Sequence, residues 1–137
     1  MEFCPGVGFI GGGGGNKINT SSGSSITGGT NNIIDENSPT STISGGYSNK
    51  ISCNVFYSSI TGGSCNTLFS ENRYSSIGGG VENILTHNSD YSFISGGASN
   101  CINDNSCYSS ITGGYLNTIT TGSQFSSILG GQLNIIN

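Results

Sequence analysis

Side chains able to perform acid-base, nucleophilic or metal chemistry are few in this sequence and share no common spacing. His87 is the only histidine, so a Ser-His-Asp arrangement or a histidine metal site would depend on one imidazole, which we interpret as solvated. Asp35-Glu36 is the only adjacent pair of carboxylates, and we interpret it as a solvated corner rather than a cation site. We therefore predict no catalytic, cofactor-binding or metal-binding residue, and a protein that is not an enzyme.

The cysteines and glycines give no convincing site either. The five cysteines are odd in number and contain no C-x-x-C pair, so we interpret them as reduced thiols; they are Cys4, Cys53, Cys65, Cys101 and Cys107. Cys101 and Cys107 flank one connecting segment, and their approach to each other is the alternative. Gly6 to Gly11 matches the dinucleotide-binding spelling G-x-G-x-x-G, but we expect neither the preceding strand nor the following helix.

The glycines belong instead to a repeat that occupies almost the whole chain. Eight copies of Ile-x-Gly-Gly-x-x-Asn-x-Ile/Leu follow one another, with one interval of sixteen residues and six of seventeen between their first residues. These first residues are Ile10, Ile26, Ile43, Ile60, Ile77, Ile94, Ile111 and Ile128. Self-similarity at a short fixed period is typical of stacked supersecondary units.

Each repeat reads as two short strands of about four residues joined by a corner. In segments such as Tyr57 to Ile60, strand alternation places the isoleucine and the serine two positions before it on the inner side. The aromatic residue and the flanking Ser or Thr then face outward. The glycine pair supplies positive φ at the corner, and Asn-x-Ile begins the second strand.

Strands this short need neighbours, so the repeats must stack. We predict an all-β fold, a parallel β-solenoid or β-roll of about eight 17-residue coils, with two ladders of aliphatic side chains inside. We expect the asparagines to form a third ladder that bonds the turn backbone and the next coil. The predicted organisation is an N-terminal lead-in, 1–9, and a single β-solenoid repeat domain, 10–137.

Outward residues suggest two further ladders. Tyr57, Tyr74, Tyr91, Tyr108 and Phe125 form an aromatic column, which we expect to pack coil upon coil; a stripe for sugar stacking or a partner protein is the alternative. A second column of Ser and Thr is similar to the Thr-x-Thr arrays of ice-binding solenoids, although Gly78, Phe93 and Leu129 interrupt it.

Phrases such as Ser59 to Asn66 and Ser76 to Asn83 resemble the YadA-type head repeats of trimeric autotransporter adhesins. The resemblance covers residues 10 to 136 and implies a left-handed parallel β-roll in which three chains pack side by side, hence a homotrimer. The repeat is longer than the roughly fourteen residues of that family. From the residues of this sequence we expect no signal peptide, coiled-coil stalk or membrane anchor beside the repeats. The high content of Asn and Ile also makes the sequence similar to repeat-rich structural proteins of large DNA viruses.

Composition narrows the partners that the chain can have. Only 7% of residues are charged, the formal net charge is -4, and the three basic residues, Lys17, Lys50 and Arg73, form no stripe. We therefore expect no nucleic-acid binding and no membrane insertion.

These observations predict a non-enzymatic structural protein, a trimeric β-solenoid building block of a viral particle. We expect it in the virion, assembled in the host cytoplasm, with other particle proteins or a host surface as partners. The alternative is an adhesin or receptor-binding fibre head module on an extracellular surface. We expect no cofactor in either case.

Overall fold

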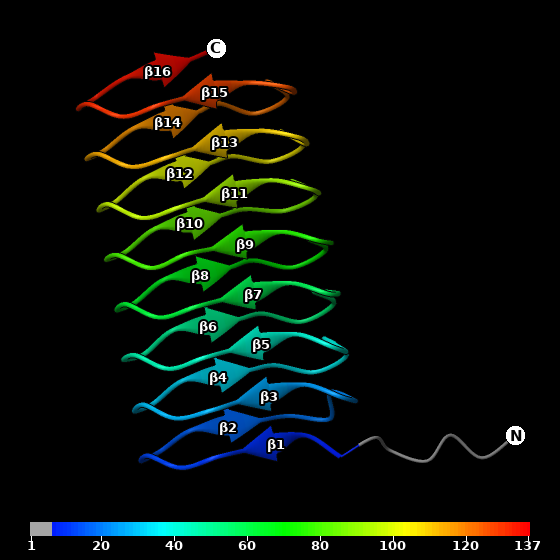
Figure 1. Cartoon of the computed structure of the whole chain (residues 1–137). Helices are drawn as coiled ribbons and strands as arrows, with labels where there is room; N and C mark the ends of the chain where they lie inside the picture. The colour runs from blue at the N-terminus through cyan, green and yellow to red at the C-terminus, as the bar shows by residue number, and fades with distance from the viewer. Residues whose placement is uncertain (1–6) are drawn as a thin grey trace, which may run out of the picture.

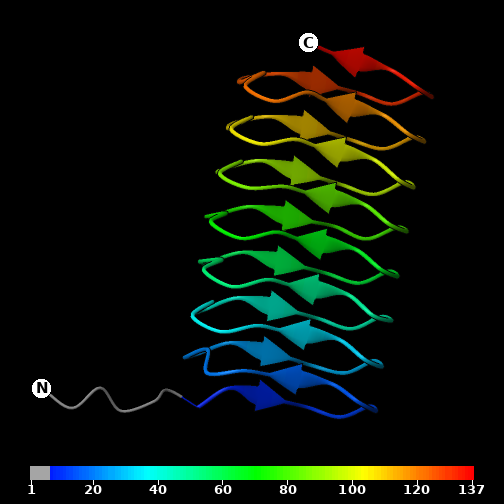
Figure 2. The same cartoon turned by 180° about the vertical axis from the view of Figure 1, so that it is seen from behind.

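The computed structural model describes residues 7–137, and this part of the chain is all-β, without a helix. It is a β-solenoid in which each coil contributes one strand to each of two parallel eight-stranded sheets, as Figures 1 and 2 show from opposite sides. The predicted fold of about eight stacked coils is confirmed. The coil that begins with β1 and the coil that ends with β16 lie at opposite ends of the stack (Figure 1).

The first sheet contains the odd-numbered strands, and each holds the first isoleucine of a repeat. They are β1 (Phe9–Ile10), β3 (Ser25–Ile26), β5 (Thr42–Ile43), β7 (Ser59–Ile60), β9 (Ser76–Ile77), β11 (Phe93–Ile94), β13 (Ser110–Ile111) and β15 (Ser127–Ile128). The second sheet contains the even-numbered strands, which hold the last aliphatic residue of each repeat. They are β2 (Lys17–Ile18), β4 (Ile33–Ile34), β6 (Lys50–Ile51), β8 (Thr67–Leu68), β10 (Ile84–Leu85), β12 (Cys101–Ile102), β14 (Thr118–Ile119) and β16 (Ile135–Ile136).

Register follows the repeat without slippage. Ile60 pairs with Ile43 in the coil before and with Ile77 in the coil after, and every other strand pairs in the same way. Equivalent side chains therefore lie above one another, and the aliphatic residues of the two sheets meet in a narrow core. Those from Ile26 to Ile119 are fully buried, together with Val55.

The asparagines form the expected ladder at the corner between the two strands. Asn83 Nδ2 donates to Gly79 O of its own coil at 3.0 Å and to Gly97 O of the next coil at 2.9 Å. Its Oδ1 accepts from the Asn100 N–H at 3.0 Å, so one side chain joins two turns. Asn32 to Asn117 are fully buried in this role, which satisfies polar groups that the thin core could not tolerate unpaired.

Two serine ladders close the opposite end of the core, and only one of them follows from the strand alternation. The predicted inward serines, such as Ser75, are buried, and Ser75 Oγ accepts from the Ser92 N–H at 3.4 Å while donating to Ser89 O at 3.0 Å. A further ladder runs through Ser89 and Ser106, which the sequence reading missed.

The strands are two residues long, not about four as predicted. Left-handed residues on both sides interrupt the extended backbone: Tyr57 has φ 53° before β7, and Gly63 has φ 82° after it. The backbone hydrogen bonds between coils continue beyond the strands. Ser44, for example, follows β5, and its N–H still donates to Ile60 O of the next coil at 3.0 Å. The positive φ expected of the glycine pair occurs at its second member in every coil.

Candidate interaction surfaces

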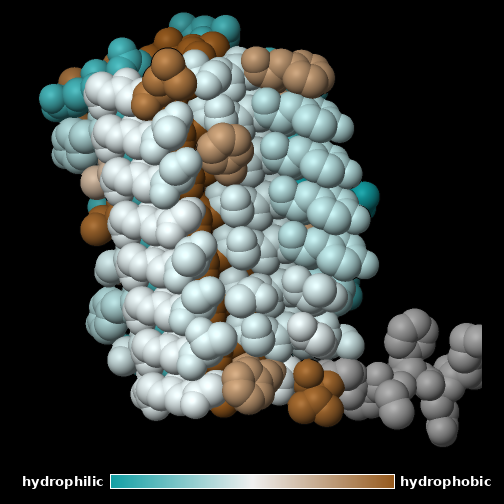
Figure 3. All heavy atoms as spheres, viewed as in Figure 1, coloured by the Kyte–Doolittle hydropathy of each residue, from teal (hydrophilic) through white to brown (hydrophobic). Residues whose placement is uncertain are grey.

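The outer surface of the odd-strand sheet is a broad face without charge, which we call the neutral face. Two columns of outward side chains cover it, one preceding and one following the buried isoleucines. The first is Phe9, Ser25, Thr42, Ser59, Ser76, Phe93, Ser110 and Ser127, and the second is Gly11, Thr27, Ser44, Thr61, Gly78, Ser95, Thr112 and Leu129. Figure 3 views this side, where near-white columns of small side chains surround a few brown apolar ones.

The aromatic column stands along one edge of the neutral face and packs coil upon coil, as expected. Tyr57, Tyr74, Tyr91, Tyr108 and Phe125 stack with ring centroids 5.0–5.1 Å apart and interplanar angles of 2–11°. We call this the aromatic ladder. Each inner ring has a neighbour against both faces, so the stack presents ring edges and hydroxyls to solvent. Sugar stacking needs an open ring face, and the inner rings have none to offer.

A corner groove runs beside the ladder, on the side away from the neutral face. It consists of two adjoining hollows of about 400 Å³ each that share the column Phe56, Arg73 and Asp90, and Tyr57, Tyr74 and Tyr91 complete the first of them. The Arg73 guanidinium carbon lies 5.8 Å from the Phe56 ring centroid, and the Arg73 backbone N–H donates to Asp90 Oδ1 at 2.7 Å.

The second hollow of the corner groove is polar. Asn54, Glu71 and Asn88 line it, and Asn88 Nδ2 donates to Glu71 Oε2 at 3.2 Å. The groove therefore combines a cation, two carboxylates and two amides along an aromatic wall. Sequence reading missed it, although the seventeen-residue spacing of Phe56, Arg73 and Asp90 already places these three in adjacent coils.

The residues singled out for chemistry do not converge. His87 is exposed as expected, with Nδ1 3.4 Å from Asp104 Oδ1 and its ring 5.7 Å from that of Phe69. Asp35 differs from the solvated corner that we predicted, because its Oδ2 lies 2.9 Å from Lys50 Nζ on the outer side of the even-strand sheet. Asn19 Nδ2 also donates to Asp35 Oδ1 at 3.1 Å. Glu36 is exposed.

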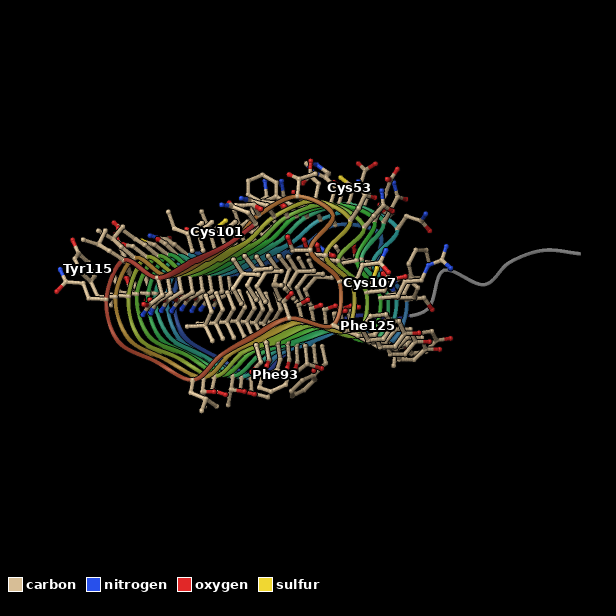
Figure 4. The ribbon with its side chains drawn as sticks, turned by 90° about the horizontal axis from the view of Figure 1, so that it is seen from above. Cys53, Phe93, Cys101, Cys107, Tyr115 and Phe125 are labelled. Atoms are coloured by element: carbon tan, nitrogen blue, oxygen red, sulfur yellow. The ribbon has the colours of Figure 1, made fainter. Side chains whose placement is uncertain are left out.

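The four described cysteines, Cys53, Cys65, Cys101 and Cys107, are free thiols, and Cys4 lies outside the described residues. Figure 4 places Cys101 on the even-strand side and Cys107 at the corner beside the ladder, so the alternative of their approach is not realised. Burial, and then the charge of Asp104, raises the pKa of the Cys101 thiol to about 11. That thiol is protonated at neutral pH and is a poor nucleophile.

Within residues 7–137, no three His, Cys, Asp or Glu side chains gather where they could hold a metal ion. The Gly6 of the G-x-G-x-x-G spelling lies outside this range, and Phe9–Ile10 at the end of that segment forms β1. The described chain also contains no helix that is long and apolar enough to cross a membrane.

Comparison of the chain with models of known protein families gives no match, and comparison with curated proteins gives none either. The arrangement of the surfaces is therefore what bears on function. One broad side is neutral, the other carries an ion pair, and a charged groove separates them at the corner beside the ladder.

Proposed function

We propose that this protein is a non-enzymatic structural protein, a trimeric β-solenoid building block of a viral particle. One observation carries the proposal: the ordered interior consists of ladders that join each coil to the next. Asn83, Ser75 and Ile77 each repeat in neighbouring coils and contact their own equivalents or the turns beside them. Such a body supplies a rigid rod with the same outer pattern at every level.

Side-by-side association would supply what the narrow core lacks. A thin solenoid buries little apolar area per residue, so contacts between chains are an effective added source of stability. The free thiols Cys53 and Cys65, which are exposed, suit assembly in a reducing compartment such as the host cytoplasm. The virion setting rests on the similarity in residue usage that the sequence suggests.

Two measurements test this function. Mass spectrometry of purified particles from the native source should detect the chain as a stoichiometric component; its absence from the particles contradicts the structural role. Light scattering of the purified protein should give three times the chain mass of 13.9 kDa. A mass equal to that of a single chain contradicts the trimer.

The corner groove favours a second candidate, an adhesin or receptor-binding fibre head module. Arg73 has no carboxylate within ion-pair distance among residues 7–137, and amides and carboxylates surround it, a mixture suited to a hydroxyl-rich ligand such as a glycan. Binding to immobilised glycans that is lost in Arg73→Ala and retained in Lys50→Ala would support this candidate. Equal binding by the two variants, or none by the native chain, would remove it.

A further inference from the structure

Charge is segregated among the surfaces of the rod. None of the sixteen outward positions on the neutral face carries a charge. The even-strand side carries Lys17, Lys50 and Asp35, and the corner groove carries Arg73, Glu71 and Asp90. Burying a charge without a partner costs far more than burying a serine or threonine hydroxyl, so the neutral face is the broad side that another chain can cover most cheaply.

The two edges of the neutral face have complementary shapes. The aromatic ladder projects along one edge, whereas small residues such as Gly78 and Thr112 form the other. In the coil that contains β15, both edges carry an exposed apolar side chain. Phe125 is 74% exposed at the ladder edge and Leu129 is 85% exposed at the other. Figure 4, viewed along the rod, shows Phe93 and Phe125 on the same side of the molecule.

We propose that the neutral face is the contact surface between copies of this chain, with the aromatic ladder of one copy against the Thr- and Gly-containing edge of the next. The partner is a second copy arranged in parallel around an axis along the rods. This inference rests on the side-by-side association of the proposed function and names the surface that performs it.

Parallel rods explain the position of the exposed apolar residues. Coils of parallel rods lie at equal heights, so Leu129 of one copy meets Phe125 of its neighbour, and each of the four tyrosine rings of the ladder meets a small residue of the opposite edge. The opposite corner of the coil also exposes apolar residues, among them Tyr115 and Leu133, but it is only one turn wide and includes Glu82.

The area of the neutral face limits the size of each contact. Eight coils spaced by about 4.8 Å and a width of five residues at about 3.3 Å each give roughly 600 Å² for the face with its ladder. In a trimer each chain divides this face between two neighbours, so each of the three interfaces covers roughly 600 Å² in total, less than the about 1,200 Å² of a standard two-chain interface, and the assembly depends on the three contacts forming together. Short side chains permit the close approach that this contact requires.

Matched lysine substitutions test the surface. Thr61→Lys combined with Thr112→Lys places two charges on the neutral face, whereas Thr67→Lys combined with Thr118→Lys places the same change on the even-strand side. Lys17 and Lys50 occupy positions equivalent to Thr67 in the even-strand sheet, so lysine is compatible with this column. Light scattering should show that the first variant falls to single-chain mass and that the second keeps the native mass.

A second pair of substitutions, which adds no charge, tests the same surface in case the lysine variants do not fold. Leu129→Thr removes the proposed apolar packing on Phe125, and Ile135→Thr makes a similar change on the even-strand side of the same coil, where Ile135 is 62% exposed. The first variant should weaken association by roughly tenfold at each interface between two copies, and the second should leave it unchanged. Circular dichroism confirms that both remain folded.

The outcomes separate the two proposals. An oligomer that survives both neutral-face variants, or that dissociates in the even-strand variants instead, overturns the assignment of the face while leaving the structural role intact. A native chain of single-chain mass overturns both the face and the trimer. An oligomer that dissociates as predicted but is absent from purified particles supports the face and contradicts the particle role.

Discussion

At the scale of single residues, the two glycines of each repeat have different tasks. The second one takes a left-handed φ and lies against the next coil, so a Cβ there would overlap with a backbone carbonyl. In the fourth coil this residue is Gly63, with φ 82°, and the nearby atoms are Gly80 O and Asn66 Nδ2. The first one, Gly62, has open space around it and no left-handed φ. Every repeat of this chain has both glycines, but packing requires only one of them.

Alanine substitutions should separate these two tasks. Gly63→Ala combines backbone strain with overlap in the ladder, and we expect it to lower the free energy of unfolding by about 3 kcal/mol or more. Gly62→Ala should change it by less than about 1 kcal/mol, because the position is open. Urea denaturation followed by circular dichroism measures both. Similar losses in the two variants would contradict the geometric distinction.

At the scale of elements, the aromatic ladder links coils through residues that sit in an unfavourable backbone conformation. Tyr57, Tyr74, Tyr91, Tyr108 and Phe125 have φ between 53° and 58°, a region that bulky side chains rarely occupy. The equivalent residues of the earlier coils are Gly23 and Thr40, also left-handed. Stacking, on both ring faces for Tyr74, Tyr91 and Tyr108, therefore offsets the backbone cost in the later coils and fixes the edge of the neutral face.

Tyr91→Asn tests the contribution of the stack. Asparagine tolerates the left-handed region, so the substitution removes the stacking on both ring faces without adding backbone strain. We expect a loss of about 1–2 kcal/mol in the free energy of unfolding. Tyr115→Asn is the control, since Tyr115 is similarly exposed but has no stacked ring among the described residues, and it should cost less than about 0.5 kcal/mol. Equal losses would show that the stack adds nothing.

At the scale of the whole molecule, the solenoid is a one-dimensional array in which each coil contacts only its neighbours. The pairs Ile60↔Ile77 and Leu68↔Leu85 show that equivalent positions in adjacent coils are seventeen residues apart. The number of coils can therefore change without loss of the fold, whereas the position of each residue within its coil cannot.

Deletion variants should reveal this difference. Removal of residues 84–100, one complete repeat, joins Asn83 to Cys101 in the correct phase and should leave a folded rod that is shorter by one coil. Removal of residues 84–92 joins Asn83 to Phe93, so residues of the odd-strand sheet take the positions of the even-strand sheet in that coil. The residues that follow are then out of register with the core, and we expect the variant not to fold because polar residues would enter the core. Circular dichroism and thermal unfolding distinguish the two. A phase-shifted variant that folds as well as the other would contradict the ladder architecture.

The sequence predicted most of the interior, because a fixed repeat decides which residue lies above which. It identified the inward isoleucines, the Asn83 ladder and the inward Ser75, and it predicted that rings such as Tyr91 pack against their equivalents. It did not predict the second serine ladder at Ser89, the two-residue strands or the Asp35–Lys50 pair. These depend on how sharply each corner bends, which residue types do not specify.

By itself, then, the sequence determined the all-β repeat architecture, the coil period and the composition of the core. Only the tertiary structure decided which columns become neighbours around the coil. The left-handed residues at the corners set that angular order: they bring Phe56, Arg73 and Tyr74 into one groove and place the charge-free serine and threonine columns together on one side of the coil. A repeat period fixes distances along the rod, whereas the surfaces available to partners depend on angles about it.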